Sequence, residues 1–99
     1  MSTRIREEGS ARDGAGALSR DEYRERLTEL PPSAKLVAKV LEIEAPLTQG
    51  ELGDRTLLPD RTVRYALSRL EEGELLESQY SIRDARKQVY ALKYEGARG

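Results

Sequence analysis

Apolar residues recur at helical spacing through the first two thirds of the chain, and the last third contains two short strand-like runs. The first helical pattern predicts a short amphipathic helix over residues 20–29, because Ser19 and Glu22 have the spacing of a capping box and two prolines follow. Its apolar positions are Tyr23, Leu27 and Leu30.

A second helix is expected from Ser33, a suitable N-cap residue, to about Ala45, where Pro46 ends it. Four apolar residues predict one stripe along this helix, which we expect to form the first wall of the core. They are Leu36, Val37, Val40 and Leu41.

Two further helices follow closely. Thr48 and Glu51 again have capping-box spacing and predict a short helix that ends near Thr56. After a turn, Pro59 suits the first position of a fourth helix that ends at Glu72 or Gly73. The inner face of this fourth helix is expected to consist of Val63, Ala66, Leu67 and Leu70.

The remaining pattern predicts strands over 75–80 and 87–93, joined by a charged loop, with a stub of strand at Leu47. Tyr80, Tyr90 and Leu92 are expected in the core. The fold class is therefore α+β and mostly helical, with a three-helix core, a C-terminal hairpin and an extra N-terminal helix. The expected organisation is a flexible tail over 1–18, the first helix over 19–30, one domain over 33–93 and a short tail over 94–99.

The composition of the 99-residue chain excludes several classes of protein. It contains no Cys and no His, so thiolate and imidazole chemistry and the usual transition-metal ligands are missing. Paired acids on a buried face and a phosphate-cradling Gly motif are also missing, so we expect no enzyme, metal or cofactor. An apolar run of roughly 20 residues, as a bilayer requires, is likewise absent, and we expect a cytoplasmic protein with no membrane partner.

Charge is unevenly distributed along the chain. The formal net charge is only -1, but segment 55–69 carries +3, segment 83–87 carries +2, and the remaining residues carry -6. The two basic segments fall on the predicted fourth helix with its preceding turn and on the hairpin loop. This segregation favours a partner with negative charge at these two places.

Two short helices joined by a tight turn and followed by a hairpin with a basic tip are typical of a winged helix-turn-helix. In this layout, the second helix of the pair enters the major groove of DNA. The hairpin, or wing, reaches the adjacent minor groove or backbone. We therefore expect helix 59–72 to read the major groove and the loop 81–87 to contact the flanking DNA.

Helical geometry selects the candidate DNA-contacting residues. At about 100° per residue, the face opposite the apolar stripe presents arginine forks, hydroxyl groups and one tyrosine, all suited to bases or phosphates. Asp60 either accepts from a cytosine amino group or pairs with Arg64. The candidates on this helix are Arg61, Thr62, Arg64, Tyr65 and Ser68.

Further candidates lie outside this helix. Thr48 and Gln49, at the start of the preceding helix, are expected to assist a phosphate contact. On the wing, Arg83 and Lys87 are expected to attract phosphates generally. For all these residues a plain solvated surface is the alternative, and Asp84 with Arg86 can form a simple loop ion pair.

Several runs of sequence resemble the small winged-helix regulators of the MarR type, especially the short archaeal members. The runs are LTQGEL at 47–52, LPDRTVRYAL at 58–67, LEE at 70–72, DAR at 84–86 and YAL at 90–92. The similarity covers about residues 33–93. It implies sequence-specific binding of double-stranded DNA as a dimer, with Arg86 entering the minor groove and Asp84 orienting it.

The chain departs from this family pattern in two places. Gly73 lies one residue before the usual glycine position, which Glu74 occupies instead, and this predicts an altered turn. Longer members carry flanking helices that form the dimer and a ligand pocket, whereas this sequence ends six residues after Lys93, which argues against a small-molecule effector.

The oligomeric state rests on the first helix. Its stripe of Tyr23, Leu27 and Leu30 either folds back on its own domain or forms a dimer surface, and we favour the dimer. A two-fold axis would place two reading helices about one DNA turn apart on a palindromic operator. The alternative function is a winged-helix module of the transcription machinery that binds another protein, which the nearly neutral net charge favours.

Overall fold

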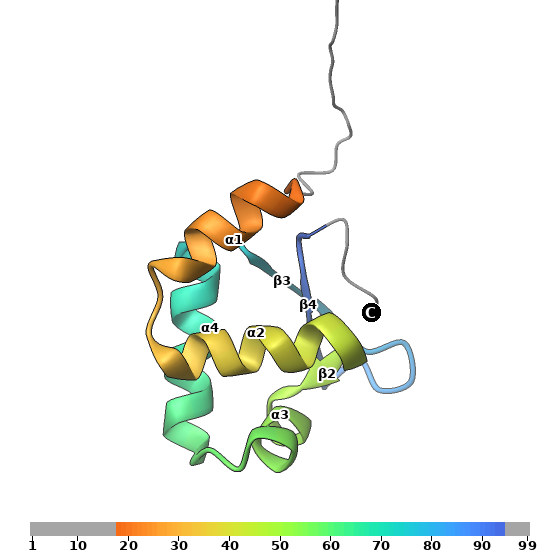
Figure 1. Cartoon of the computed structure of the whole chain (residues 1–99). Coiled ribbons are helices and arrows are strands. Elements are labelled where there is room, and N and C mark those ends of the chain that lie inside the picture. The colour runs from red at the N-terminus through yellow and green to blue at the C-terminus, as the bar shows by residue number, and fades with distance from the viewer. Residues whose placement is uncertain (1–17, 95–99) are drawn as a thin grey trace, which may run out of the picture.

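The computed structural model describes residues 18–94, and these form four helices and a small sheet (Figure 1). Helix α1 lies across one end of the molecule, α2 crosses in front of α4, and α3 lies at the opposite end from α1. The winged helix-turn-helix expected from the sequence is confirmed. The elements in order are α1 (Arg20–Thr28), α2 (Pro32–Glu44), β2 (Leu47–Thr48), α3 (Gln49–Thr56), α4 (Asp60–Glu72), β3 (Leu76–Tyr80) and β4 (Gln88–Leu92).

Two of the helices begin with the capping boxes expected from the sequence. The Ser19 hydroxyl accepts a hydrogen bond from the Glu22 amide, and the Glu22 carboxylate accepts one from the Ser19 amide, each at 3.2 Å. Thr48 and Glu51 make the same reciprocal pair at the start of α3. Both boxes satisfy backbone donors that the first helical turn would otherwise leave free.

The start of α2 differs from the expectation. Ser33 does not cap the helix, because Pro31 occupies the N-cap position and Pro32 the first helical position. A proline is favourable at that position since its fixed φ matches the helix and its missing N–H costs no hydrogen bond. Helix α4 starts one residue later than expected, because Pro59 is the N-cap and Asp60 is the first helical residue.

The buried face of α2 also differs from the predicted stripe. Leu36 is 40% exposed and Val40 is only partly buried, and two of the four buried residues of this helix are alanines. Small side chains allow α2 and α4 to approach closely. The buried residues of α2 are Ala34, Val37, Ala38 and Leu41.

The sheet has the order β2-β4-β3 and is antiparallel throughout. Leu76 lies opposite Leu92, and Tyr80 lies opposite Gln88 where the hairpin opens into the wing loop. The stub of strand expected at Leu47 is confirmed as β2, which pairs with β4 at Tyr90. Pairing of β2 with β4 thereby holds the start of α3 next to the base of the wing.

One core joins all the elements. The predicted inner face of α4 is confirmed, since its four apolar residues are at most 4% exposed. Leu92 is buried and Tyr90 is partly buried against the core, but the expectation for Tyr80 is wrong. Tyr80 is 66% exposed because it lies at the end of β3, beyond the part of the sheet that the helices cover.

The domain extends to Leu18 and Tyr94, both of which the sequence analysis assigned to tails. These residues form a parallel bridge, and the Tyr94 ring stacks on Tyr23 with ring centroids 4.2 Å apart. The remaining tail predictions, for 1–17 and 95–99, lie outside the described residues.

The apolar stripe of α1 folds back on its own domain, which corrects the preferred dimer interpretation. Tyr23 and Leu27 are 1% and 6% exposed, and Leu30 is partly buried against the same core. The Tyr23 hydroxyl donates a hydrogen bond to Glu42 on α2. Burial and this bond raise the pKa of Tyr23 well above its ordinary value. An α1 docked in this way has little apolar surface left for a second copy.

Among residues 18–94, no helix is both long and apolar enough to cross a membrane.

Candidate DNA interface

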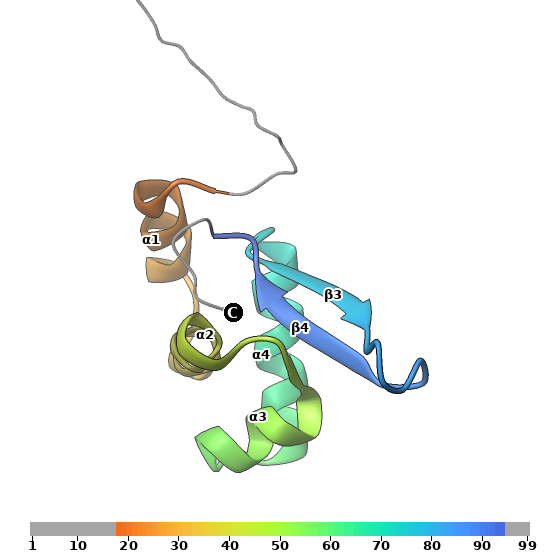
Figure 2. The same cartoon turned by 90° about the vertical axis from the view of Figure 1, so that its right-hand side faces the viewer.

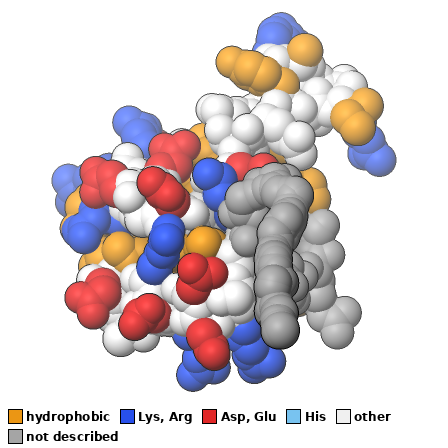
Figure 3. All heavy atoms as spheres, turned by 90° about the horizontal axis from the view of Figure 1, so that it is seen from above, with side chains coloured by type: hydrophobic (Ala, Val, Ile, Leu, Met, Phe, Trp, Pro, Cys, Tyr) orange, Lys and Arg blue, Asp and Glu red, His pale blue; other side chains and the backbone are white. Residues whose placement is uncertain are grey.

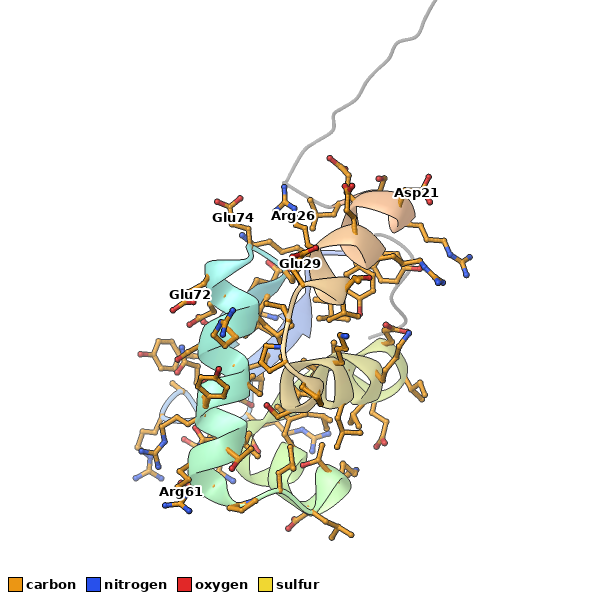
Figure 4. The ribbon with its side chains drawn as sticks, turned by 60° about the vertical axis from the view of Figure 1, so that its left-hand side comes forward. Asp21, Arg26, Glu29, Arg61, Glu72 and Glu74 are labelled. Atoms are coloured by element: carbon orange, nitrogen blue, oxygen red, sulfur yellow. The ribbon has the colours of Figure 1, made fainter. Side chains whose placement is uncertain are left out.

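The candidate interface begins with the outward face of α4. This helix packs on α2 and the sheet through its apolar stripe, so its polar residues point away from the core. Arg61 lies at the N-terminal end of α4 with its side chain directed outward (Figure 4). Among the described residues, no carboxylate pairs with Arg61. Of the five candidates on α4, Thr62 is half-buried. The other four are exposed, namely Arg61, Arg64, Tyr65 and Ser68.

Asp60 connects the two helices of the helix-turn-helix. Its Oδ1 atom accepts a hydrogen bond of 2.7 Å from the Gln49 amide nitrogen on α3. Its Oδ2 atom accepts one from Arg64, four residues along α4. These bonds hold the pKa of Asp60 below its ordinary range, with the Gln49 bond as the largest cause. The pairing with Arg64, one of the two roles left open by the sequence, is the one adopted.

A second pair lies one turn further along α4. Arg69 donates a hydrogen bond of 3.0 Å to the Tyr65 hydroxyl, and its guanidinium lies 5.9 Å from the Tyr65 ring centre. Arg69 also pairs with Glu72 at 3.4 Å. These contacts fix the direction of the Tyr65 side chain, which remains 49% exposed.

The start of α3 presents its N-terminus beside α4. The Thr48 hydroxyl accepts from the Glu51 amide at 3.1 Å, which leaves the hydroxyl proton free to bind an acceptor. The Thr48 amide in turn donates to the Glu51 carboxylate and lowers the pKa of Glu51. Thr48 is therefore the N-cap of α3, and its hydroxyl can also donate a hydrogen bond to a phosphate.

The wing projects away from the helices as the loop between β3 and β4 (Figure 2). Asp84 accepts from the Arg86 backbone amide at 3.0 Å and from its Nε at 3.3 Å. The Arg86 side chain is 91% exposed. Arg83 and Lys87 are also exposed, and the loop is closed by a 2.7 Å bond from the Ser81 amide to the Lys87 carbonyl.

Sequence reasoning missed two features of this region. Tyr80 and Ile82 are exposed at the wing, Ile82 completely, and they line a groove of about 650 Å3 that also touches Pro46 and Thr48. The bridge from Asp60 to Gln49 was also not foreseen. The proximity of segments 46–51 and 79–89, which forms the groove, depends on pairing of β2 with β4, for which Leu47 was the only sequence signal.

The outward face of α4 and the wing share one side of the molecule. In Figure 2, α2 and the wing lie on opposite sides of α4. The apolar stripe of α4 is buried, and α2 is the element that α4 contacts most extensively. The polar face of α4 therefore points to the side on which the wing projects. The end of the molecule formed by α1, by contrast, carries a mixture of acidic and basic side chains (Figure 3).

This arrangement defines a winged helix-turn-helix in which α4 and the wing both carry exposed basic residues. The model of the MarR family matches residues 28–87, more than half of the chain, and the chain belongs to this family. No curated protein sequence matches the chain significantly.

Several solved structures share the fold. BpsR from Bordetella bronchiseptica superposes with a TM-score of 0.65 at 21% identity, covering 78% of this chain and 61% of BpsR. PcaV from Streptomyces coelicolor gives 0.63 at 26% identity, covering 76% and 54%. A ZitR mutant from Lactococcus lactis gives 0.64 at 22% identity, covering 69% and 46%. The chain thus spans about half the length of these structures.

Proposed function

We propose that the chain is a transcriptional regulator that binds double-stranded DNA in a sequence-specific manner. In this proposal α4 enters the major groove, and wing residues 81–87 contact the adjacent minor groove or backbone. The residues that would bind DNA are Thr48, Gln49, Arg61, Thr62, Arg64, Tyr65, Ser68, Arg83, Arg86 and Lys87, with Asp84 orienting Arg86.

The observation that carries the proposal is the shared direction of two basic surfaces from separate parts of the chain. Arg61 and Arg64 on α4 and Arg86 on the wing are all exposed, and their elements face the same side. Arginine forks match the O6 and N7 atoms of guanine as well as phosphate oxygens. A surface of this kind suits a polyanion with a groove better than it suits a neutral partner.

The comparison with one neighbour adds support by analogy. An S. aureus MepR mutant was solved bound to an oligodeoxyribonucleotide, and it superposes on this chain with a TM-score of 0.62 at 18% identity. We further propose a homodimer on a palindromic operator, because a two-fold axis relates two reading helices to two half-sites. Because Tyr23 and Leu27 are buried within their own domain, dimerisation would use another surface.

The test is selection of bound duplexes from a random DNA pool by the wild-type chain, followed by affinity measurements on the selected sequence. Enrichment of a palindrome is expected. Replacing both Arg61 and Arg64 by alanine is expected to weaken binding at least tenfold, because each lost base or phosphate contact lowers affinity. Arg24→Ala, which removes an exposed arginine from α1, is the matched control and is expected to bind as the wild type does.

Failure to enrich any duplex at low salt would contradict the proposal. It would favour the alternative, a winged-helix module that binds another protein of the transcription machinery. Enrichment that survives the double substitution unchanged would contradict the role of α4.

A further inference from the structure

Asp60 is the only acidic residue of α4 within its DNA-facing half, and it holds two candidate readers at once. One carboxylate oxygen accepts from Gln49 on α3 and the other accepts from Arg64 on α4. The two readers therefore come from different helices but share one acceptor. The bridge spans the turn between the two helices of the helix-turn-helix.

The bridge determines which atoms Gln49 presents. An ionised carboxylate only accepts hydrogen bonds, so the Gln49 amide must turn its nitrogen toward Asp60. Its oxygen is then directed away from Asp60, and an oxygen accepts from the exocyclic amino groups of adenine or cytosine. Without the carboxylate, the amide could rotate by half a turn and present the opposite pattern.

The bridge restricts Arg64 in the same way. A guanidinium has five N–H donors in a rigid plane, so a bond from one terminal nitrogen to Asp60 fixes the plane and leaves other donors for DNA. A fixed fork favours a bidentate contact with guanine over a loose contact with any phosphate.

Stability accounts for part of the preference for a carboxylate at this position, since the first turn of a helix favours a negative charge, but the ion pair itself adds little. The Asp60 and Arg64 side chains are 65% and 67% exposed, and exposed ion pairs contribute little to folding. In a DNA complex, the same negative charge would lie near phosphates and reduce general attraction. Asp60 would thus lower affinity for any duplex while it fixes the side chains that would distinguish one duplex from another.

We propose that Asp60 is a specificity-determining positioning residue, which orients Gln49 and Arg64 for base recognition at the cost of general DNA affinity. This inference rests on the proposed function, since it requires that α4 and the start of α3 bind DNA.

The test compares the wild-type chain with Asp60→Asn and Asp60→Ala on the selected duplex and on a shuffled duplex of equal length. Asn retains an acceptor but also offers donors and loses the charge, whereas Ala removes every contact. Both variants are expected to bind the shuffled duplex as tightly as the wild type or several-fold more tightly. The ratio of the two affinities is expected to fall about tenfold, and less for Asn than for Ala.

The matched control is Asp54→Asn. Asp54 is an exposed aspartate on α3, and no hydrogen bond or ion pair to its carboxylate is found within residues 18–94. Removing its charge is expected to change the affinity for both duplexes by the same small factor and to leave their ratio unchanged.

A readout without DNA tests the bridge itself. The Gln49 side-chain amide resonances of the free protein are expected to shift in Asp60→Asn and to stay in place in Asp54→Asn. Thermal unfolding of the variants, expected near the wild-type temperature, separates a positioning role from a folding defect.

The outcomes distinguish this inference from the proposed function. A wild-type chain that selects a duplex, together with Asp60 variants whose affinity ratio stays within about twofold of wild type, would overturn the positioning role alone. A wild-type chain that selects no duplex would overturn both.

Discussion

Glu74 occupies a backbone conformation that usually belongs to glycine. Its φ is 59°, and it follows Gly73 at the end of α4. The Leu75 amide bonds to the Leu70 carbonyl and the Glu74 amide to the Glu71 carbonyl, each at 2.9 Å, which is the pattern of a Schellman motif. The turn expected to be altered here is therefore a regular helix end with glutamate in the left-handed position.

This geometry predicts that Glu74→Gly is more stable than Glu74→Ala by about 1 kcal/mol, because only glycine adopts positive φ without a Cβ penalty. Both substitutions remove the 3.8 Å ion pair with Arg26, so their difference isolates the backbone effect. The measurement is the free energy of unfolding in urea. Equal stability of the two variants would show that the left-handed conformation carries no cost at this site.

Individual residues could be assigned from sequence where one helix determined their direction. The inner and outer faces of α4 followed from its periodicity and are confirmed in the burial of its stripe. The partner of Asp60 did not follow, because Gln49 approaches it from another helix. Tyr80 was misplaced because alternation along a strand does not reveal where the covering helices end.

Among the secondary-structure elements, helix α1 is an integral part of the domain. Tyr23 contacts Glu42 on α2 and stacks on Tyr94 beyond the end of β4. The Arg26 guanidinium donates to the Gly73 carbonyl at 3.0 Å, so α1 also holds the turn that follows α4. Helix α1 thus contacts α2, the turn after α4 and the segment after β4.

Tyr23→Ala is accordingly expected to destabilise the fold by about 3–5 kcal/mol, the usual cost of removing a large buried ring. Tyr80→Ala, which removes an exposed tyrosine, is the control and is expected to change stability by less than about 0.5 kcal/mol. Chemical unfolding measures both. Sedimentation adds a second readout: dissociation of a dimer into stable monomers by Tyr23→Ala would restore the dimer interpretation of this stripe.

Element boundaries were most predictable where the signal is local. The two capping boxes involve residues three positions apart, and both helices start where the sequence indicates. Helix α2 begins at Pro32 although Ser33 was expected to cap it, because Pro31 and Pro32 fit the N-cap and first helical positions. The surface on which α1 packs is determined by contacts with α2 and Tyr94, and a local sequence pattern does not contain these contacts.

At the scale of the whole molecule, a net charge of -1 conceals a polarised surface. Exposed basic residues lie on α4 and on the wing, while the α1 end carries charges of both signs (Figure 3). Several arginines of the basic segments are neutralised internally, such as Arg55 by Glu44 at 2.8 Å. Arg86 remains almost fully exposed beside Asp84, which makes it the most direct probe of the wing.

The most direct test of this account is the salt dependence of binding to the selected duplex, measured by fluorescence anisotropy for the wild type, Arg86→Ala and Arg24→Ala. For the wild type, the logarithm of the association constant is expected to fall linearly with the logarithm of salt concentration. Arg86→Ala should weaken binding several-fold and reduce the slope by about 1, while Arg24→Ala should leave both unchanged. Equal losses in the two variants would contradict DNA binding through the wing, and no binding by the wild type at low salt would contradict DNA binding as a whole.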